Sequence, residues 1–390
     1  MKYKLKDIGI IITGKTPSTK EKQNFSDKED KYLFLTPKDM STSAKYIKKT
    51  ERYLTDNVTE KFKMQIIKAN SVCISCIGSD MGKVYMVDRD TVTNQQINSI
   101  TKINSICNPH YLYYYFKDKK EYLKSIAGGS TMPILNKSTF ENIEIDLPDI
   151  QVQDRIVSIV ENIDKKIELN NQINNNLLEL GDTLIGKLNT DNQVRLGDLA
   201  SVISKGTTPT KKDIENSKEI NNIKFIRVTD FNEFGIDKNN LQYIPEDVHT
   251  GKLKRSILKE NDILVSIAGT LGKIAIVTKK LDNSNTNQAV AFVRLKEIND
   301  RGYIYFYMKT KAFQDEIESK KIHAVQPNLS LTELSNIKII KIDEDKKQIF
   351  NIILDKILQN VNQNYTLMQI RDTLLPKLIH GDIDLENINI

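Results

Sequence analysis

Cysteine and histidine are scarce in this chain of 390 residues, which has three Cys and four His. Three cysteines exclude a disulfide framework and agree with a reducing compartment. The four dispersed histidines offer neither a metal cluster nor a catalytic triad. No apolar run approaches the ~18 residues of a membrane span, and the N-terminal Met1-Lys2-Tyr3-Lys4 lacks an apolar signal segment. We therefore expect a soluble, cytoplasmic protein.

The charge of the chain is unevenly distributed, within a net charge of +6. Residues 1–148 carry 24 Lys and Arg against 17 Asp and Glu, and residues 191–340 carry 23 against 19. Residues 149–190 carry 4 against 7, and residues 341–390 carry 6 against 8. Basic blocks suit a polyanion such as DNA, whereas the acidic blocks should face something else. Chance variation in surface charge is the alternative.

A tandem repeat is the strongest feature of the sequence, because the second half repeats the first about 191 residues later. The matches keep their order across whole halves: Gly14-Lys15-Thr16-Pro17 with Gly206-Thr207-Thr208-Pro209, Thr93-Asn94-Gln95 with Thr286-Asn287-Gln288, and Tyr111–Tyr115 with Tyr303–Tyr307. Two similar domains in one chain imply pseudo-two-fold symmetry. Duplex DNA also has a dyad, so such a protein can read two half-sites.

Each repeat alternates short β-branched runs with polar turns, which is typical of a mixed α+β domain. The run from Ser71 to Ile77 and its counterpart Ile263 to Ile267 predict buried strands. The segments Tyr111 to Ile126 and Tyr303 to Ile317 predict helices. With length allowing roughly 100–200 residues per domain, we expect two similar domains at 1–148 and 191–340.

Two long helices are expected between and after these domains, at 149–190 and 341–390. Apolar residues recur there at heptad spacing, which indicates a coiled coil. An antiparallel register sets Asn170 against Asn364 and Asn174 against Asn360, and core asparagines of this kind fix register. The same register sets Gly181 against Ile353 and Ile163 against Arg371, the one poor match, while Pro376 should distort the last turn. The alternative is that each helix packs on its own domain.

A helix of this length would act as a rod. At 1.5 Å per residue, about 36 residues span about 54 Å. Such a rod would hold two basic domains apart by about one to one and a half turns of B-DNA at ~34 Å per turn. This predicts a bipartite DNA site, in which two short half-sites flank a nonspecific spacer of set length.

At this point the sequence resembles the specificity (S) subunit of type I restriction-modification enzymes, over essentially the whole chain. The segment Leu147 to Val157 resembles the start of the family's first conserved helix, although Val152-Gln153 stands where the family favours Glu-Gln. Leu374-Leu375-Pro376-Lys377-Leu378 with Gly381 resembles its C-terminal tail, and the Gly-x-Thr-Pro turn is present in both repeats.

The resemblance implies a non-catalytic subunit that binds double-stranded DNA. It implies two modification subunits, which use S-adenosylmethionine to methylate adenine N6, and two restriction subunits, which hold an ATP-driven translocase and nuclease. S-adenosylmethionine, ATP and Mg are therefore expected in the partners, and no cofactor or metal in this chain.

Repeated polar loops are the best candidates for contact with DNA. Gly and Pro turns can bring amides and hydroxyls to phosphate, and Asn or Gln can read adenine. The plainer alternative for each is an ordinary turn or cap, and Arg227 could grip guanine or merely pair with Asp230. The candidates are Lys15, Thr16, Ser18, Ser79, Lys83, Gln95, Ser130, Thr131, Thr207, Thr208, Thr210, Arg227, Thr270, Lys273, Gln288, His323, Gln326 and Asn328.

Three motifs suggest chemistry that their context opposes. Gly9 to Thr16 fits a P-loop, but Pro17 follows and the Ile-Ile-Ile interior suits a strand. Cys73 and Cys76 fit C-x-x-C, but a zinc site needs four ligands, so we expect core residues. Asn108-Pro109-His110-Tyr111 approaches a methyltransferase motif, yet a helix N-cap suits it better.

Two other functions compete with a non-catalytic DNA reader. A self-sufficient methyltransferase or NTPase needs a cofactor loop that both repeats lack. A pure coiled-coil scaffold would not retain duplex DNA, whereas a DNA reader should lose affinity steeply with salt.

Overall fold

The computed structural model describes residues 1–40, 45–59, 61–128, 133–188, 192–239, 241–319 and 328–385. The chain forms two compact units. Unit 1 comprises Met1–Glu168 with Leu367–Ile390, and unit 2 comprises Leu169–Thr366. No helix in the described part of the chain is long and apolar enough to cross a membrane.

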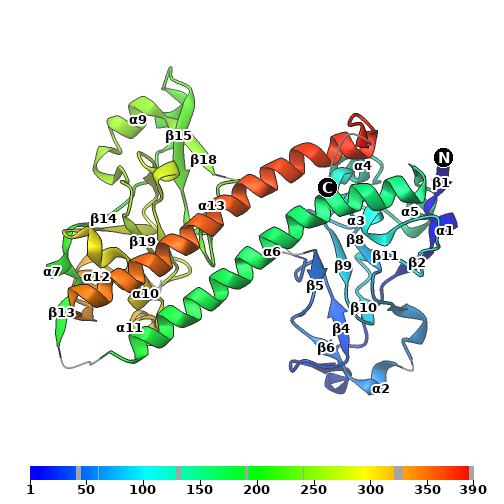
Figure 1. Ribbon diagram of the computed structural model, residues 1–390, viewed down its shortest axis with the longest axis horizontal. Coiled ribbons are helices and arrows are strands. Elements are labelled where there is room, and N and C mark those ends of the chain that lie inside the picture. The colour runs from blue at the N-terminus through cyan, green and yellow to red at the C-terminus, as the bar shows by residue number, and fades with distance from the viewer. Residues whose placement is uncertain are drawn as a thin grey trace. The chain divides into compact units, whose positions relative to one another are not determined.

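The central sheet of unit 1 has the strand order β2-β11-β8-β9-β5, labelled in Figure 1. Its strands are β2 (Ile10–Thr13), β11 (Ile97–Thr101), β8 (Val72–Ser75), β9 (Val84–Val87) and β5 (Tyr46–Ile47). The predicted strand at 71–77 is β8, and it is buried on both faces. Val72 and Ile74 lie in the helical core, while Cys73 faces the second sheet of the unit, which explains the unbroken apolar run.

The second sheet of unit 1 has the order β3-β6-β4-β10-β7. Its strands are β3 (Phe25–Ser26), β6 (Tyr53–Leu54), β4 (Tyr32–Leu35), β10 (Thr91–Thr93) and β7 (Ile66–Ile67). Strands β4 and β10 pair in parallel. A separate ribbon joins β1 (Lys2–Lys4) to β12 (Glu144–Asp146), so the start and the end of the domain lie together.

The helices of unit 1 are α1 (Leu5–Ile8), α2 (Asp56–Thr59), α3 (Pro109–Asp118), α4 (Lys120–Ser125) and α5 (Lys137–Glu141), with 3-10 turns η1 (Lys22–Asn24) and η2 (Lys63–Gln65). The segment from Tyr111 to Ile126 is helical as predicted, in two helices, α3 and α4. It is divided at Lys119, whose backbone (φ −94°, ψ 20°) leaves the helical region and whose N–H turns back to the carbonyl of Phe116.

Unit 2 repeats this plan in the same chain order. Its central sheet runs β14 (Ala200–Lys205), β22 (Val290–Leu295), β19 (Ile263–Ser266), β20 (Ile274–Ile276). The second sheet runs β18 (Gln242–Pro245), β15 (Asn221–Ile226), β21 (Asn285–Thr286), and β15 pairs with β21 in parallel, as β4 does with β10. Two ribbons join β13 (Gln193–Arg195) to β23 (Lys338–Ile340), and β16 (Phe231–Asn232) to β17 (Gly235–Ile236). The repeat in sequence is therefore a repeat of fold.

The helices of unit 2 are α7 (Leu196–Leu199), α8 (Lys211–Glu215), α9 (Glu246–Thr250), α10 (Arg301–Lys309), α11 (Lys311–Ser319) and α12 (Leu331–Asn336), with 3-10 turns η3 (Val228–Asp230), η4 (Lys254–Ser256), η5 (Lys279–Leu281) and η6 (Ile298–Asp300). The helix predicted from Tyr303 to Ile317 is also two helices, because Thr310 adopts an extended conformation (φ −62°, ψ 153°).

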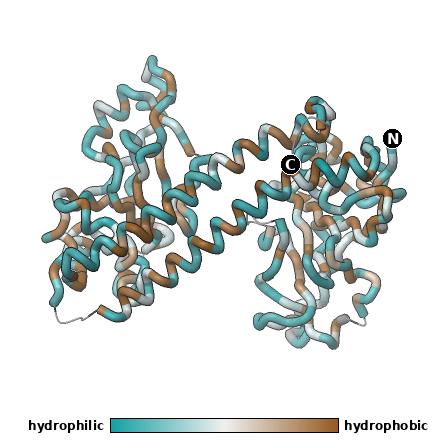
Figure 2. Tube along the Cα trace, in the orientation of Figure 1, coloured by the Kyte–Doolittle hydropathy of each residue, from teal (hydrophilic) through white to brown (hydrophobic). Residues whose placement is uncertain are grey.

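Two 37-residue helices, α6 (Ile150–Gly186) and α13 (Glu344–His380), each contribute to both units. Hydrophobic and polar residues alternate along both (Figure 2). In unit 1, Ile156 and Val160 of α6 share a core with Leu378 of α13 and with α3. In unit 2, Phe350 and Ile353 of α13 pack with α10 and with the last turns of α6. The helices therefore pair antiparallel with each other and pack on the domains as well.

Asparagines occupy two buried layers of this helix pair in unit 2. Nδ2 of Asn170 donates to Oδ1 of Asn364, and Nδ2 of Asn360 donates to Oδ1 of Asn174, each at 2.8 Å. These are the pairs expected from the spacing. Nδ2 of Asn174 is buried and has no hydrogen-bond partner among the described residues.

Two other layers have contacts that the helix register alone does not describe. A Cβ at Gly181 would lie 2.3 Å from the ring of Phe306, so an aromatic ring of α10 fills the space beside that glycine. Arg371, expected to oppose Ile163 poorly, instead lies 2.8 Å from Asp164. Pro376 lies inside α13, which continues to His380.

Candidate nucleic-acid interface

The candidate loops of unit 1 leave one edge of the central sheet. In the register of its antiparallel strands, Asn98 pairs with Thr13, and Ile97 pairs with Ser75. The end of β2, the end of β8 and the start of β11 therefore meet at the same edge. Loops 14–18, 76–83 and 94–96 extend from it, so residues far apart in sequence come together.

The candidate loops of unit 2 leave the matching edge. Ala291 pairs with Lys205, and Val290 pairs with Ser266. Loops 206–210, 267–273 and 287–289 consequently lie at the corresponding end of β14, β19 and β22. The chain builds this loop edge twice.

Glycine allows the first and the third loop of each edge to pack against each other. A Cβ at Gly14 would lie 2.2 Å from the carbonyl oxygen of Thr93, and one at Gly206 would lie 2.0 Å from that of Thr286. The next amides, of Lys15 and Thr207, donate to these same oxygens at 2.9 and 3.1 Å. No other residue fits there, which explains the glycine of the Gly-x-Thr-Pro turn.

A threonine–glutamine pair forms at each edge. Oγ1 of Thr16 donates to Oε1 of Gln95 at 2.6 Å. In unit 2, Oγ1 and the backbone amide of Thr208 both donate to Oε1 of Gln288, the amide at 3.1 Å. Both glutamines are exposed. The threonine orients the glutamine amide, and the amide NH2 is the end that remains suited to donate to a base edge.

The loops after β8 and β19 are built alike from glycines with positive φ. These are Gly78 (80°) and Gly82 (82°) in unit 1, and Gly269 (72°) and Gly272 (80°) in unit 2. The buried serine that ends each strand holds the loop that follows, because its hydroxyl accepts a hydrogen bond from the backbone amide of the candidate lysine. The distance is 3.0 Å from Lys83 to Ser75 and 2.8 Å from Lys273 to Ser266. The backbone of both loops is thus held in one conformation.

The side chains of these loops differ between the units. Ser79, Thr270 and Lys273 are exposed. Nζ of Lys83, in contrast, lies 2.8 Å from the carboxylate of Asp80, which leaves it less suited to a phosphate than Lys273.

A third segment lies beside each glycine loop. The amide of Gly78 donates to the carbonyl of Pro133 at 3.0 Å, and the amide of Leu329 donates to the carbonyl of Ile267 at 2.9 Å. Exposed Asn328 forms a bridge with Ala268. The candidates Ser130, Thr131, His323 and Gln326 lie outside the described residues.

Three other candidates have contacts that stabilise their own loops. Oδ1 of Asp230, which is buried, accepts from Nη2 of Arg227 at 3.0 Å, so Arg227 is held by the carboxylate. Thr210 caps α8 through a reciprocal pair with Asp213. Lys15 and Ser18 are exposed, as is Thr207, and Nζ of Lys15 lies 5.9 Å from the ring of Phe62.

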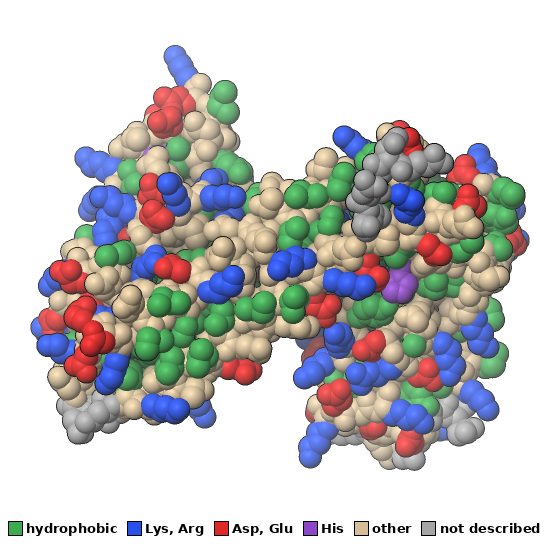
Figure 3. All heavy atoms as spheres, in the orientation of Figure 1, with side chains coloured by type: hydrophobic (Ala, Val, Ile, Leu, Met, Phe, Trp, Pro, Cys, Tyr) green, Lys and Arg blue, Asp and Glu red, His purple; other side chains and the backbone are tan. Residues whose placement is uncertain are grey.

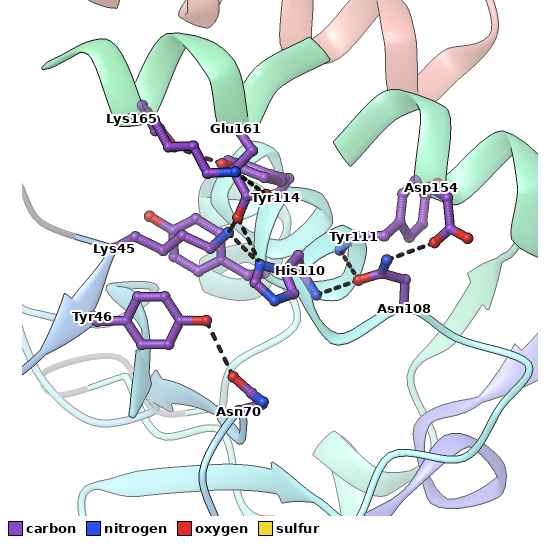
Figure 4. A network of polar contacts seen from close by, with 12 residues as sticks. Lys45, Tyr46, Asn70, Asn108, His110, Tyr111, Tyr114, Asp154, Glu161 and Lys165 are labelled. Atoms are coloured by element: carbon purple, nitrogen blue, oxygen red, sulfur yellow. Dashed lines mark hydrogen bonds and ion pairs between the residues drawn. The ribbon is translucent and has the colours of Figure 1, made fainter. Parts of the chain in front are cut away.

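A charged network that the sequence did not reveal attaches the recognition domain of unit 1 to α6 (Figure 4). Nζ of Lys45 donates to Oε1 of Glu161 at 3.0 Å and also to Nδ1 of His110. Burial lowers the pKa of both Lys45 and His110. Burial is the largest single effect on Glu161 and opposes its ionisation, but the contacts with Lys45, Lys165 and His110 together outweigh burial and lower the pKa of that carboxyl.

This network has a second part, in which Asn108 acts as the expected N-cap of α3. Its Oδ1 accepts the amides of His110 and Tyr111, while its Nδ2 donates to Asp154 of α6 at 2.7 Å. The residues come from segments more than 40 positions apart, so no sequence spacing could signal them. Their arrangement positions the domain on the helix.

The motifs that suggested other chemistry have structural roles. Residues Ile10–Thr13 form strand β2, and a loop rather than a helix follows Gly14. The segment from Gly9 to Thr16 is therefore not a P-loop. The three cysteines are free and buried, and burial raises the pKa of each thiol to about 12. Among the described residues, no group of three His, Cys, Asp or Glu is arranged to hold a metal ion.

Comparison with known proteins agrees with two recognition domains. The sequence profile of the family described as "Type I restriction modification DNA specificity domain" matches residues 1–179 and again residues 190–367. The type I restriction enzyme MjaIX specificity subunit of Methanocaldococcus jannaschii is 27% identical, over 99% of this chain and 94% of the relative. The MjaVIII specificity subunit of the same organism is 24% identical, over 86% of each chain.

Solved structures support the fold. The crystal structure of a type I restriction-modification S subunit from M. genitalium covers 97% of this chain and 95% of its own, with a TM-score of 0.52 at 17% sequence identity. Together with a repeated loop edge and a repeated fold, these findings lead to one conclusion: the chain belongs to the type I restriction-modification DNA specificity family, and its part in such a system is recognition rather than catalysis.

Proposed function

We propose that this chain reads a bipartite DNA site, one short half-site for each recognition domain, across a nonspecific spacer of set length. The recognition domains are residues 1–148 and 191–340, and the spacer helices are residues 149–190 and 341–390. The observation that carries the proposal is the loop edge, which the chain builds twice from the same residue types at the same strand ends.

Within each edge we assign separate roles to two kinds of residue. Gln95 and Gln288, oriented by Thr16 and Thr208, are the candidates to read a base, since a glutamine amide suits adenine. Exposed groups around them hold phosphates and position the domain without reading sequence. These are Lys15, Ser18, Ser79, Thr207, Thr270, Lys273 and Asn328.

The chemistry of the assembly belongs to its partners. Two modification subunits supply methyl transfer from S-adenosylmethionine to adenine N6, and two restriction subunits supply ATP- and Mg-dependent translocation and cleavage. The S chain holds them around the site that it reads, in the cytoplasm where the DNA lies.

The experiment is a map of N6-methyladenine by single-molecule sequencing, in the strain that carries this gene and in its deletion. The deletion should lose one bipartite motif, and the lost motif gives the target directly. If no motif disappears, co-purification with a methyltransferase separates a silent system from an incorrect proposal.

Complementation of the deletion tests the two edges. Gln95→Ala should weaken or relax the motif in one half-site only, and Gln288→Ala in the other, because each glutamine amide is the group proposed to read a base in its own half-site. Gln359→Ala is the matched control, since Gln359 is exposed on α13 and contacts Lys356. A change in both half-sites from one substitution would contradict the assignment of one domain to each half.

A further inference from the structure

Two lysines of unit 2 lie over one tyrosine of α13, and a third lysine contacts the backbone of the second. Lys224 lies in β15, Lys238 follows β17, Lys280 lies in η5, and Tyr365 lies near the middle of α13. Nζ of Lys238 lies 5.7 Å from the centre of the Tyr365 ring, and Nζ of Lys280 lies 5.6 Å from it. Nζ of Lys224 donates to the backbone carbonyl of Lys280 at 2.6 Å. We call these residues the lysine cluster.

Neutral groups rather than carboxylates hold the lysine cluster. Nζ of Lys238 donates to Oδ1 of Asn362 at 2.7 Å. In the part of the chain that the structure describes, none of the three ammonium groups forms an ion pair with a carboxylate. Burial lowers the pKa of Lys238 to about 8, with a smaller contribution from the charges of Lys280 and Lys224. Like charges held together in this way are unfavourable until an anion joins them.

Unit 1 shows how a comparable lysine is neutralised. Lys48 follows β5, and its Nζ lies 3.1 Å from the carboxylate of Glu168, a residue of α6. Lysines and arginines elsewhere on the visible surface are interspersed with Asp and Glu (Figure 3). The side chains that α13 presents to Lys238 are instead Asn362 and Tyr365, so unit 2 lacks this internal counter-ion.

The lysine cluster is separate from the loop edge of unit 2. Lys280 comes before β21 begins, whereas Gln288 comes after β21 ends. Lys224 precedes Phe225, which pairs with Asn285 at the first residue of β21. The cluster therefore lies toward the opposite end of the parallel β15–β21 pair from the loop proposed to read bases.

We propose that the lysine cluster binds a phosphate of the DNA backbone outside the bases that unit 2 reads. The inference rests on the proposed function, because that function brings a polyanion to this chain. Several ammonium groups can share the oxygens of one phosphate, and such a contact carries no sequence information. The site adds affinity equally on every sequence.

The test measures DNA affinity against salt for the full-length chain with its modification subunits. Two duplexes are compared, one with the methylated motif and one without it. Lys238→Gln and Lys280→Gln should weaken binding to both duplexes by the same factor. The two substitutions combined in one chain should make the slope of log K against log salt shallower by about 1, because the shared phosphate contact is lost. The methylated motif should stay unchanged.

Controls separate this contact from folding and from the proposed function. Lys238→Arg and Lys280→Arg retain the charge and should retain the slope, and Lys48→Gln should leave it unchanged. An unchanged slope in the folded double Gln variant would overturn the inference. Loss of the modification subunits with an unchanged slope would also overturn it, and would assign the cluster to an acidic surface on that partner. Absence of any salt-dependent DNA binding in the unsubstituted complex would instead refute the proposed function.

Discussion

Arg371 offers the most direct test of how the helix pair is held in unit 1. It lies on α13 with 8% of its surface exposed. Its Nη1 is 2.8 Å from Oδ1 of Asp164 on α6, and Asp164 Oδ2 accepts the hydroxyl of Tyr114 from α3 at 2.7 Å. One guanidinium thus joins both long helices, and through Asp164 it is linked to the recognition domain. The substitution Arg371→Met removes the cation and keeps the apolar stem.

The expected loss of stability comes from the carboxylate left behind. The side chain of Asp164 is 16% exposed, and removing one partner of a buried ion pair costs about 3–5 kcal/mol. The second contact of Arg371, with the 61% exposed Asp372, adds little. For a unit of roughly 150–250 residues, about 2–4 °C accompanies each kcal/mol, so the melting temperature of unit 1 should fall by roughly 6–20 °C.

A double-mutant cycle with Asp164→Asn measures the pair itself. The double variant should be more stable than Arg371→Met alone, because a neutral amide can be buried without a cation while it keeps Tyr114 as a partner. Arg195→Met is the control, since its pair with Asp198 is exposed. Scanning calorimetry gives the melting temperatures of the four proteins of the cycle and of the control. A fall of less than about 1 kcal/mol for Arg371→Met, or strict additivity in the cycle, would refute this account.

Two further predictions concern buried polar groups. Replacing Asn174 and Asn360 together by Leu should raise the melting temperature, because each buried Leu side chain contributes about 1.5–3 kcal/mol and the unpaired Asn174 amide disappears. Asn360→Leu alone should not raise the melting temperature, because it removes the donor to Oδ1 of Asn174 and leaves the Asn174 amide without that bond. A double-mutant cycle that shows no coupling between the two positions would contradict this. Lys117→Met should stabilise unit 1 by up to about 3 kcal/mol below pH 8, because burial lowers the pKa of Lys117 to about 8. Burial of the charged lysine destabilises the folded state most below that pKa, so the stability gained by Lys117→Met should shrink between pH 8 and 10.5. Thermal unfolding of the variant and the unsubstituted chain at each pH measures this gain. An equal gain at pH 7 and pH 10 would contradict the reasoning.

The repeat and the long helices could be predicted because they are written in local patterns. Heptad spacing depends only on the 3.6-residue turn of a helix, so it indicated α6 and α13 and set Asn170 against Asn364. Helix ends depend on single backbone conformations, and for that reason the apolar pattern predicted the two helical segments but not the breaks at Lys119 and Thr310. The heptad spacing set Arg371 against Ile163, which looked unfavourable. Spacing alone does not show that Asp164, the next residue along α6, forms an ion pair with Arg371.

The amino-acid sequence by itself determined that two like domains and two antiparallel helices make up this protein, and it indicated which polar loops are repeated. Only the tertiary structure decided that these loops share one sheet edge, because strand order and register bring Thr16 to Gln95 across 79 positions. Lys45, His110 and Glu161 meet for the same reason, as do Lys224, Lys280 and Tyr365. Contacts between distant segments depend on how the strands and helices pack, and no local periodicity records that packing.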